Sequence, residues 1–107
     1  MKIRSQFEDG VLTLYFTGEL DHHAARDSMK NIEGKISSYM PRTTVLDLRA
    51  LSFMDSSGIA VILKTYRLMN EMCGRLTVQN VPEQPMRVLD ASGIDRMIEI
   101  GSALREV

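Results

Sequence analysis

Residues 51–59 of the chain read Leu-Ser-Phe-Met-Asp-Ser-Ser-Gly-Ile. An apolar, strand-like run ends in this stretch and a helical pattern begins, so an acid, two hydroxyls and a glycine stand at the join. One Ser or Asp at a helix start caps free backbone N–H groups and stabilises the helix by about 1 kcal/mol. An exposed hydroxyl there, beside a glycine that leaves the backbone uncovered, also suits a phosphoryl group, because free N–H groups and the helix dipole favour an anion. The first interpretation is purely structural, whereas the second places the function of the chain at this join.

Upstream of the join, the sequence predicts a β-hairpin. Residues 2–7 and 11–17 each alternate in polarity, as half-buried strands do. Between them, Asp9-Gly10 supplies the positive φ angles that a tight turn needs. Leu12, Leu14 and Phe16 are expected on one face of the second strand, and the other face is expected to carry Val11, Thr13, Tyr15 and Thr17.

A helix and a central strand are predicted next. Residues 18–21 break the second strand, and Asp21 is a good N-cap for a helix over residues 22–39. Pro41 ends that helix, and residues 43–48 are β-branched and apolar, as a central strand should be. The apolar stripe of the helix consists of Ala25, Met29, Ile32, Ile36 and Tyr39.

A second helix follows the join, with Gly74 expected to cap its C-terminus. Residues 75–81 alternate as a strand, residues 86–91 form a short helix opened by prolines, and residues 97–100 indicate a last edge strand. Residues 102–107 are too short to assign. The apolar stripe of the second helix consists of Ile59, Ile62, Leu63, Tyr66, Met69 and Cys73.

This element order predicts an α/β fold in a single domain over residues 1–107. The length suits one hydrophobic core and is too short for two. Strand–helix–strand units require parallel neighbours joined by right-handed crossovers, whereas the N-terminal hairpin adds an antiparallel strand. We therefore expect a small mixed β-sheet of about four to five strands with helices packed on it.

The composition argues against several partners and locations. The 13 Lys and Arg residues nearly balance the 14 Asp and Glu residues without long runs of either sign, which argues against a nucleic-acid surface and a polybasic membrane anchor. No apolar run is long enough to span a membrane, and the single cysteine, Cys73, cannot form an internal disulfide. The cytoplasm is the expected location. Most of the eight methionines are expected to fill the core.

The motifs of common enzymes are missing. The sequence contains no Walker A pattern, no G-x-G-x-x-G and no G-x-S-x-G nucleophile elbow. His22 and His23 are the only histidines, and no cysteine or carboxylate stands at a familiar ligand spacing, so we expect solvated histidines and no metal site. The chain is therefore expected to be neither an enzyme nor a cofactor-binding protein.

Two motifs together resemble the STAS family. Residues 53–59, Phe-Met-Asp-Ser-Ser-Gly-Ile, and residues 18–24, Gly-Glu-Leu-Asp-His-His-Ala, are similar to bacterial anti-sigma factor antagonists, most of all to the sporulation type. The similarity covers nearly the whole chain and implies a STAS-like fold. Typical relatives continue into a longer C-terminal helix, so a reduced last layer is expected where this chain stops at Val107.

The resemblance also implies a function. Such proteins bind an anti-sigma factor that is also a serine kinase, and so release the sigma factor that it was holding. The kinase phosphorylates the first serine after the aspartate, which is Ser56 here, and a separate serine phosphatase reverses the modification. The surface that the resemblance implies for partner contact consists of Glu19, Asp21, Asp55, Ser56, Ser57 and Ile59.

Two alternatives stay open at this point. The exposed helix N-terminus also suits a small binding module that holds a nucleotide or an anion reversibly. A subunit of a larger stress-signalling scaffold is a third possibility, although a chain made only of this domain makes it less favourable.

Overall fold

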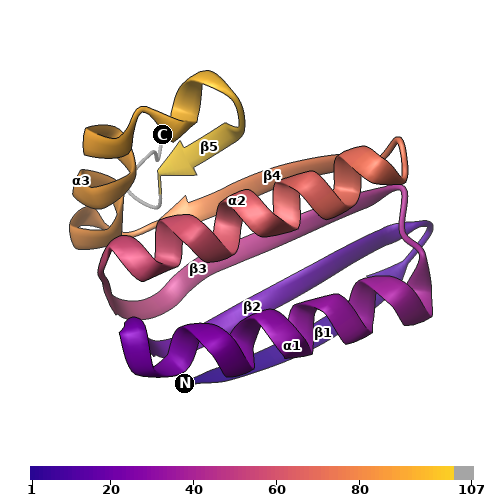
Figure 1. Ribbon diagram of the computed structural model, residues 1–107, viewed down its shortest axis with the longest axis horizontal. Helices are drawn as coiled ribbons and strands as arrows, with labels where there is room; N and C mark the ends of the chain where they lie inside the picture. The colour runs from indigo at the N-terminus through magenta and orange to yellow at the C-terminus, as the bar shows by residue number, and fades with distance from the viewer. Residues whose placement is uncertain (103–107) are drawn as a thin grey trace.

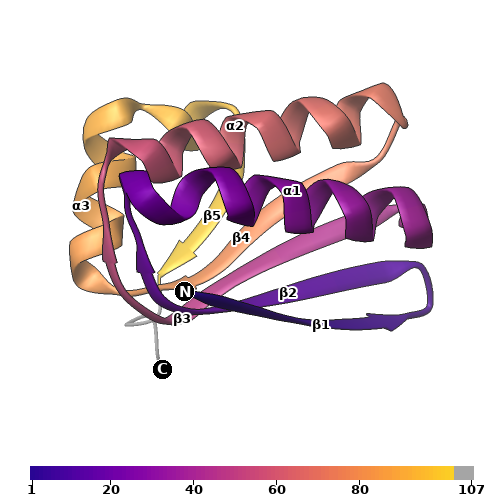
Figure 2. The same ribbon diagram turned by 60° about the horizontal axis from the view of Figure 1, so that its bottom comes forward.

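The computed structural model describes residues 1–102, which form one five-stranded sheet with helices packed on it (Figures 1 and 2). Residues 103–107, and with them the expectation of a reduced C-terminal layer, lie outside the described residues. In chain order the elements are β1 (Lys2–Glu8), β2 (Val11–Leu20), α1 (His22–Tyr39), β3 (Thr43–Met54), α2 (Ser56–Glu71), β4 (Arg75–Val81), α3 (Glu83–Ser92), the 3-10 helix η1 (Ile94–Arg96) and β5 (Glu99–Ser102).

The strands lie in the sheet in the order in which they occur in the chain, from β1 to β5. β1 pairs with β2 antiparallel, and every later pair is parallel. The predicted mixed sheet, a hairpin followed by parallel strands, is therefore confirmed. α1 and α2 lie side by side along one face of the sheet, and α3 packs against β3 and α2 (Figure 1).

The hairpin turn also agrees with the prediction. Asp9 and Gly10 have φ angles of 52° and 81°, the left-handed pair that a two-residue hairpin turn requires. Arg42, in the loop between α1 and β3, stabilises this turn, because its Nη2 donates a 2.6 Å hydrogen bond to the Asp9 carbonyl.

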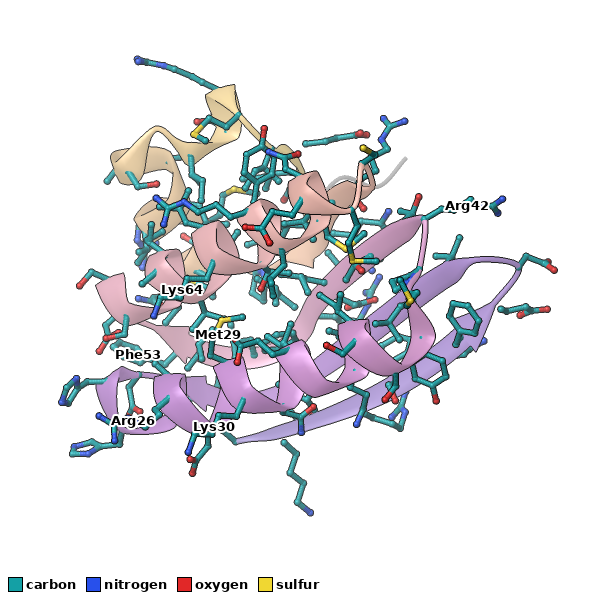
Figure 3. The ribbon with its side chains drawn as sticks, turned by 45° about the vertical axis from the view of Figure 1, so that its right-hand side comes forward. Arg26, Met29, Lys30, Arg42, Phe53 and Lys64 are labelled. Atoms are coloured by element: carbon teal, nitrogen blue, oxygen red, sulfur yellow. The ribbon has the colours of Figure 1, made fainter. Side chains whose placement is uncertain are left out.

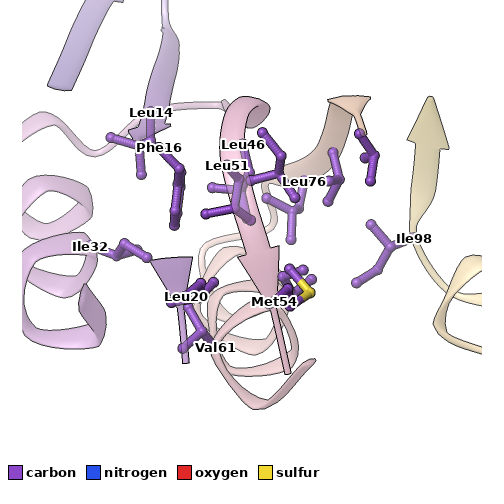
Figure 4. Packing of buried hydrophobic residues seen from close by; sticks show 14 of the residues in the cluster. Leu14, Phe16, Leu20, Ile32, Leu46, Leu51, Met54, Val61, Leu76 and Ile98 are labelled. Atoms are coloured by element: carbon purple, nitrogen blue, oxygen red, sulfur yellow. The ribbon is translucent and has the colours of Figure 1, made fainter. Parts of the chain in front are cut away.

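The core lies between the helices and the sheet (Figure 4). The face of β2 that carries Leu12, Leu14 and Phe16 is buried, and so are the central positions of the α1 stripe. Tyr39 at the end of that stripe, however, is 42% exposed and stacks on Phe7. On α2, the predicted Cys73 lies beyond the helix end and is exposed. Three of the eight methionines are core residues, namely Met29, Met54 and Met69.

The sequence predicts that residues 18–21 break the second strand. This prediction is wrong for residues 18–20, because β2 continues to Leu20. Gly18 has a φ of 111°, which glycine adopts without steric penalty, and the ladder between β2 and β3 shifts register beside it. The chain therefore bends without leaving the sheet, and Asp21 follows directly after the strand.

β3 likewise runs past its predicted end at residue 48 and reaches Met54. Tyr15 of β2 pairs with Asp47, whereas Thr17 pairs with Ala50, so β3 carries an extra residue between the two pairs. This bulge breaks the alternation of inward and outward side chains. The sequence pattern therefore did not predict the second half of β3 as a strand.

The C-terminus of α2 also differs from the prediction. The C-cap is Met72, and Cys73 rather than Gly74 takes the left-handed conformation, with a φ of 59°. Gly74 is needed for packing instead, because a Cβ atom there would lie 2.6 Å from Met69 Cε and 2.9 Å from the Arg42 carbonyl oxygen.

The last two elements are shifted relative to the prediction. α3 begins at Glu83 instead of residue 86, since Pro85 falls in its first turn, where the missing N–H would have no helical partner. β5 spans Glu99–Ser102 instead of residues 97–100, after the single turn of η1.

Candidate functional site

The parallel pairing of β2 with β3 brings the two sequence motifs together. Glu19 pairs with Phe53 and Leu20 with Met54, so both strands end at the same edge of the sheet and each leads directly into a helix. The Ser52 hydroxyl donates to the Gly18 carbonyl at 3.0 Å, which adds a side-chain bond to this junction. Residues 18–24 and 53–59 therefore form one continuous surface.

Asp55 and Asp21 are the N-caps of α2 and α1, as their residue types predict. Asp55 Oδ1 accepts the Ser57 N–H at 2.8 Å, and Asp55 Oδ2 accepts the His22 N–H at 3.1 Å. Asp21 Oδ1 accepts the Ala24 N–H at 3.0 Å. Both carboxylates are thus engaged by backbone donors, and Asp55 joins the starts of the two helices.

Ser56 and Ser57 differ in exposure. Ser56 is the first residue of α2 and is exposed, and its hydroxyl makes no hydrogen bond within residues 1–102. Ser57 is half-buried, and its backbone N–H donates to Asp55 Oδ1. Neither hydroxyl makes a hydrogen bond within residues 1–102, so the two serines differ in exposure, and Ser56 is the more accessible one at the helix N-terminus.

Gly58 has a packing role that the sequence did not reveal. The prediction that it leaves the backbone uncovered is wrong, because Gly58 is buried. A Cβ atom at this position would lie 2.5 Å from Met54 Cγ and 2.9 Å from Met54 Sδ. The glycine lets the Met54 side chain, which has no exposed surface, pack beneath the first turn of α2.

Gln84 of α3 stabilises the end of β3 beside the site, and the sequence did not predict this contact. Its Oε1 accepts the Met54 N–H and its Nε2 donates to the Met54 carbonyl, both at 2.9 Å. The side-chain amide thus pairs with the last residue of β3 as a neighbouring strand would. The only local signal was its place between Pro82 and Pro85, which indicated a helix start and nothing about a contact.

The remaining predicted contact residues differ in exposure. Glu19 is exposed and Ile59 is half-buried. Phe53, which the prediction did not include, is 39% exposed (Figure 3). It is a candidate anchor for a partner, since aromatic residues are enriched at the centres of interfaces.

The two histidines are exposed, as predicted, with ring centroids 5.4 Å apart. In the described part of the chain, no group of three or more His, Cys, Asp and Glu side chains is arranged to hold a metal ion. Across the same residues, no helix has both the length and the apolar character that crossing a membrane requires.

Comparisons with known proteins identify relatives of this chain. Residues 2–107 match the STAS domain family. The chain is 36% identical over 100 residues to the anti-sigma F factor antagonist of Paenibacillus polymyxa, a match that covers 94% of this chain and 86% of that protein.

Two solved structures of a similar protein share the fold. One is the anti-sigma factor antagonist SpoIIAA in its unphosphorylated form, which is 26% identical with a TM-score of 0.71 and covers 92% of this chain and 86% of that chain. The other is the Bacillus cell fate determinant SpoIIAA in the phosphorylated form, with 29% identity, a TM-score of 0.70 and coverage of 92% and 90%. The sequence motifs, the sheet order and these matches agree, and the chain belongs to the STAS domain family.

Proposed function

We propose that this chain is an anti-sigma factor antagonist of the sporulation type, acting in the cytoplasm by binding and not by catalysis. Its unphosphorylated form binds an anti-sigma factor with serine kinase activity and so releases a sigma factor. Phosphorylation of Ser56 ends this binding, and a serine phosphatase restores it. The names of the relatives support the partner class. The observation that carries the proposal is the exposed Ser56 at the start of α2, where residues 18–24 and 53–59 lie next to each other.

The position of Ser56 supports its role as the phosphate acceptor. A kinase must reach the hydroxyl, and Ser56 is exposed whereas Ser57 is half-buried. A phosphate at the first residue of α2 lies at the positive end of the helix dipole, so the helix tolerates it. The domain can therefore be modified without unfolding.

The effect of the phosphate on binding is electrostatic in this proposal. Phosphorylation adds a charge of about −1.5 to −2. A partner carboxylate or nucleotide phosphate about 5 Å away would be repelled by roughly 3 kcal/mol per charge pair at an effective dielectric constant near 20, which is more than about a hundredfold in affinity. The similar TM-scores to the unphosphorylated and phosphorylated forms of SpoIIAA, 0.71 and 0.70, support a switch without a change of fold.

The test is incubation with the candidate anti-sigma kinase from the same genome and ATP, followed by mapping of the modified residue by mass spectrometry. We expect one phosphate, on Ser56. Phosphate on Ser57 would move the acceptor, and no phosphate with any such kinase would contradict the proposal. A rise in melting temperature on adding ATP without a kinase would favour a nucleotide-binding module instead.

A further inference from the structure

An open groove of about 640 Å³ runs between α1 and α2 on the outer side of the helix layer. The side chains at its centre are small on both helices, since Ala25 lies on α1 and Ala60 on α2. Two longer apolar side chains, Met29 and Val61, form its floor and are buried. The exposed apolar surface in the groove therefore comes from the two alanines rather than from its floor.

The rim of the groove is basic. Arg26 and Lys30 stand one turn apart on α1, and Lys64 lies opposite on α2 (Figure 3). All three are exposed, and the ion pairs found within residues 1–102 involve other residues. Asp27 is the one acid among the lining residues. Three cations without partners thus surround an apolar floor, in a chain whose formal net charge is −1.

The groove is continuous with the surface around Ser56. Ser57, the next residue, lines its end. α1 and α2 each follow one parallel strand and precede the next, so they run in the same direction and begin at the same end of the molecule. Lys64 lies seven residues beyond Ser57, or about 10 Å along α2 at 1.5 Å per residue. A partner segment that contacts Ser56 can therefore enter the groove directly.

We propose that this groove binds an acidic, amphipathic segment of the partner, an inference that rests on the proposed function. Carboxylates of that segment pair with Arg26, Lys30 and Lys64, while its apolar side chains cover Ala25 and Ala60. Charge complementarity selects this occupant, because a basic or neutral segment would leave the three cations without partners. The groove extends the contact surface beyond the residues that the sequence motifs indicate.

The groove also gives the phosphate on Ser56 a defined target. A group with a charge of about −2 at the end of the groove repels an acidic segment and competes with it for the same cations. The side chains that attract the unmodified partner thus take part in its release.

Charge reversal on the rim tests the inference. Lys64→Glu and Arg26→Glu are compared with Arg67→Glu, which makes the same charge change at an exposed position of α2 outside the groove. The dissociation constant for the anti-sigma kinase is measured by calorimetry, and far-UV circular dichroism checks that each variant is folded. We expect each groove variant to weaken binding about tenfold or more, with a loss that shrinks at high salt, and Arg67→Glu to stay within about twofold of the unsubstituted chain.

Three results would overturn the inference, and they are distinguishable from one another. If the unsubstituted chain binds the kinase but both groove variants bind as tightly, the groove is not a contact and the proposed function stands. If the unsubstituted chain binds no such kinase, the proposed function and the groove inference fall together. If the groove variants lose binding of ATP or inorganic phosphate alone while partner affinity is unchanged, the groove is an anion site.

Filling the groove with Ala60→Phe provides a variant without charge change and should also weaken partner binding.

Discussion

Asp55 accepts a hydrogen bond from the backbone N–H of His22 at 3.1 Å, across 33 positions of the sequence. The same carboxylate caps α2 through Ser57. One side chain therefore caps α2 and connects it to the start of α1, so residues 18–24 and 53–59 are joined by a hydrogen bond as well as by the sheet. This linkage makes Asp55 a structural residue of the site, whether or not a partner contacts it.

Replacing Asp55 should therefore destabilise the domain more than replacing Asp21, which accepts one N–H. Loss of a cap typically lowers the free energy of unfolding by about 1 kcal/mol, and we expect about that for Asp21→Ala. Asp55→Ala also removes the bond from the His22 N–H, which is exposed and contributes about 0.5 to 1.5 kcal/mol, so we expect about 1.5 to 2.5 kcal/mol in total. Urea denaturation of both variants gives the comparison. Equal losses would show that the bond between the helices contributes nothing measurable.

The phosphorylation proposal predicts opposite results for two substitutions of Ser56. Ser56→Ala should fold, bind the anti-sigma kinase and incorporate no phosphate. Ser56→Asp places a carboxylate at the surface position and should weaken binding by about tenfold or more in calorimetry. Ser57→Ala is the matched control and should still be phosphorylated. An unchanged affinity of Ser56→Asp would count against electrostatic repulsion as the main cause of release.

Periodicity in the sequence was sufficient to predict the sheet, its hairpin and the faces of α1 and β2. It failed at the second half of β3, where Ser52 and the outward-facing Phe53 lie between buried Leu51 and Met54. An extra residue in one strand has no signature in hydrophobic alternation, because the pattern depends on how the neighbouring strand is paired.

The site was predictable in its local parts and not in its long-range contacts. The caps at Asp21 and Asp55 follow from residue type at a helix start. The amide of Gln84, however, meets Met54 only because α3 returns to the end of β3, 30 positions away. The groove between α1 and α2 likewise requires two helices whose relative position no single segment encodes.

Gln84 should stabilise the site through both groups of its amide. Gln84→Ala leaves the N–H and carbonyl of Met54 without their partners, and we expect the free energy of unfolding to fall by about 1 to 3 kcal/mol. Gln84→Glu keeps the size but replaces the donor with a carboxylate oxygen facing the Met54 carbonyl, so it should be no better than alanine. Gln79→Ala, at an exposed position of β4, is the control for loss of a glutamine. A fully stable Gln84→Glu variant would show that the donated bond does not matter.

Two glycine-to-alanine substitutions should change stability in opposite directions, although both lie in helices. Alanine is favoured over glycine inside a helix by about 1 kcal/mol, and a Cβ atom at Gly34 of α1 meets nothing within 4 Å, so Gly34→Ala should stabilise the domain by roughly that amount. At Gly58 the new Cβ atom would lie 2.5 Å from Met54 Cγ. Met54 is completely buried, and the clash involves Cγ, close to its backbone, as well as Sδ at 2.9 Å, so overpacking of about 1 to 3 kcal/mol should exceed the gain in helix propensity.

A double-mutant cycle separates the clash from other effects of Gly58→Ala. Met54→Ala removes the atoms that the new Cβ would meet, and it destabilises the core on its own by leaving a cavity. Adding Gly58→Ala to Met54→Ala should then be neutral or stabilising, with a coupling free energy of about 1 kcal/mol or more between the two positions. Thermal or urea unfolding of the four proteins measures this coupling. If the two changes are additive, Gly58 is required for some reason other than the packing of Met54 beneath the first turn of α2.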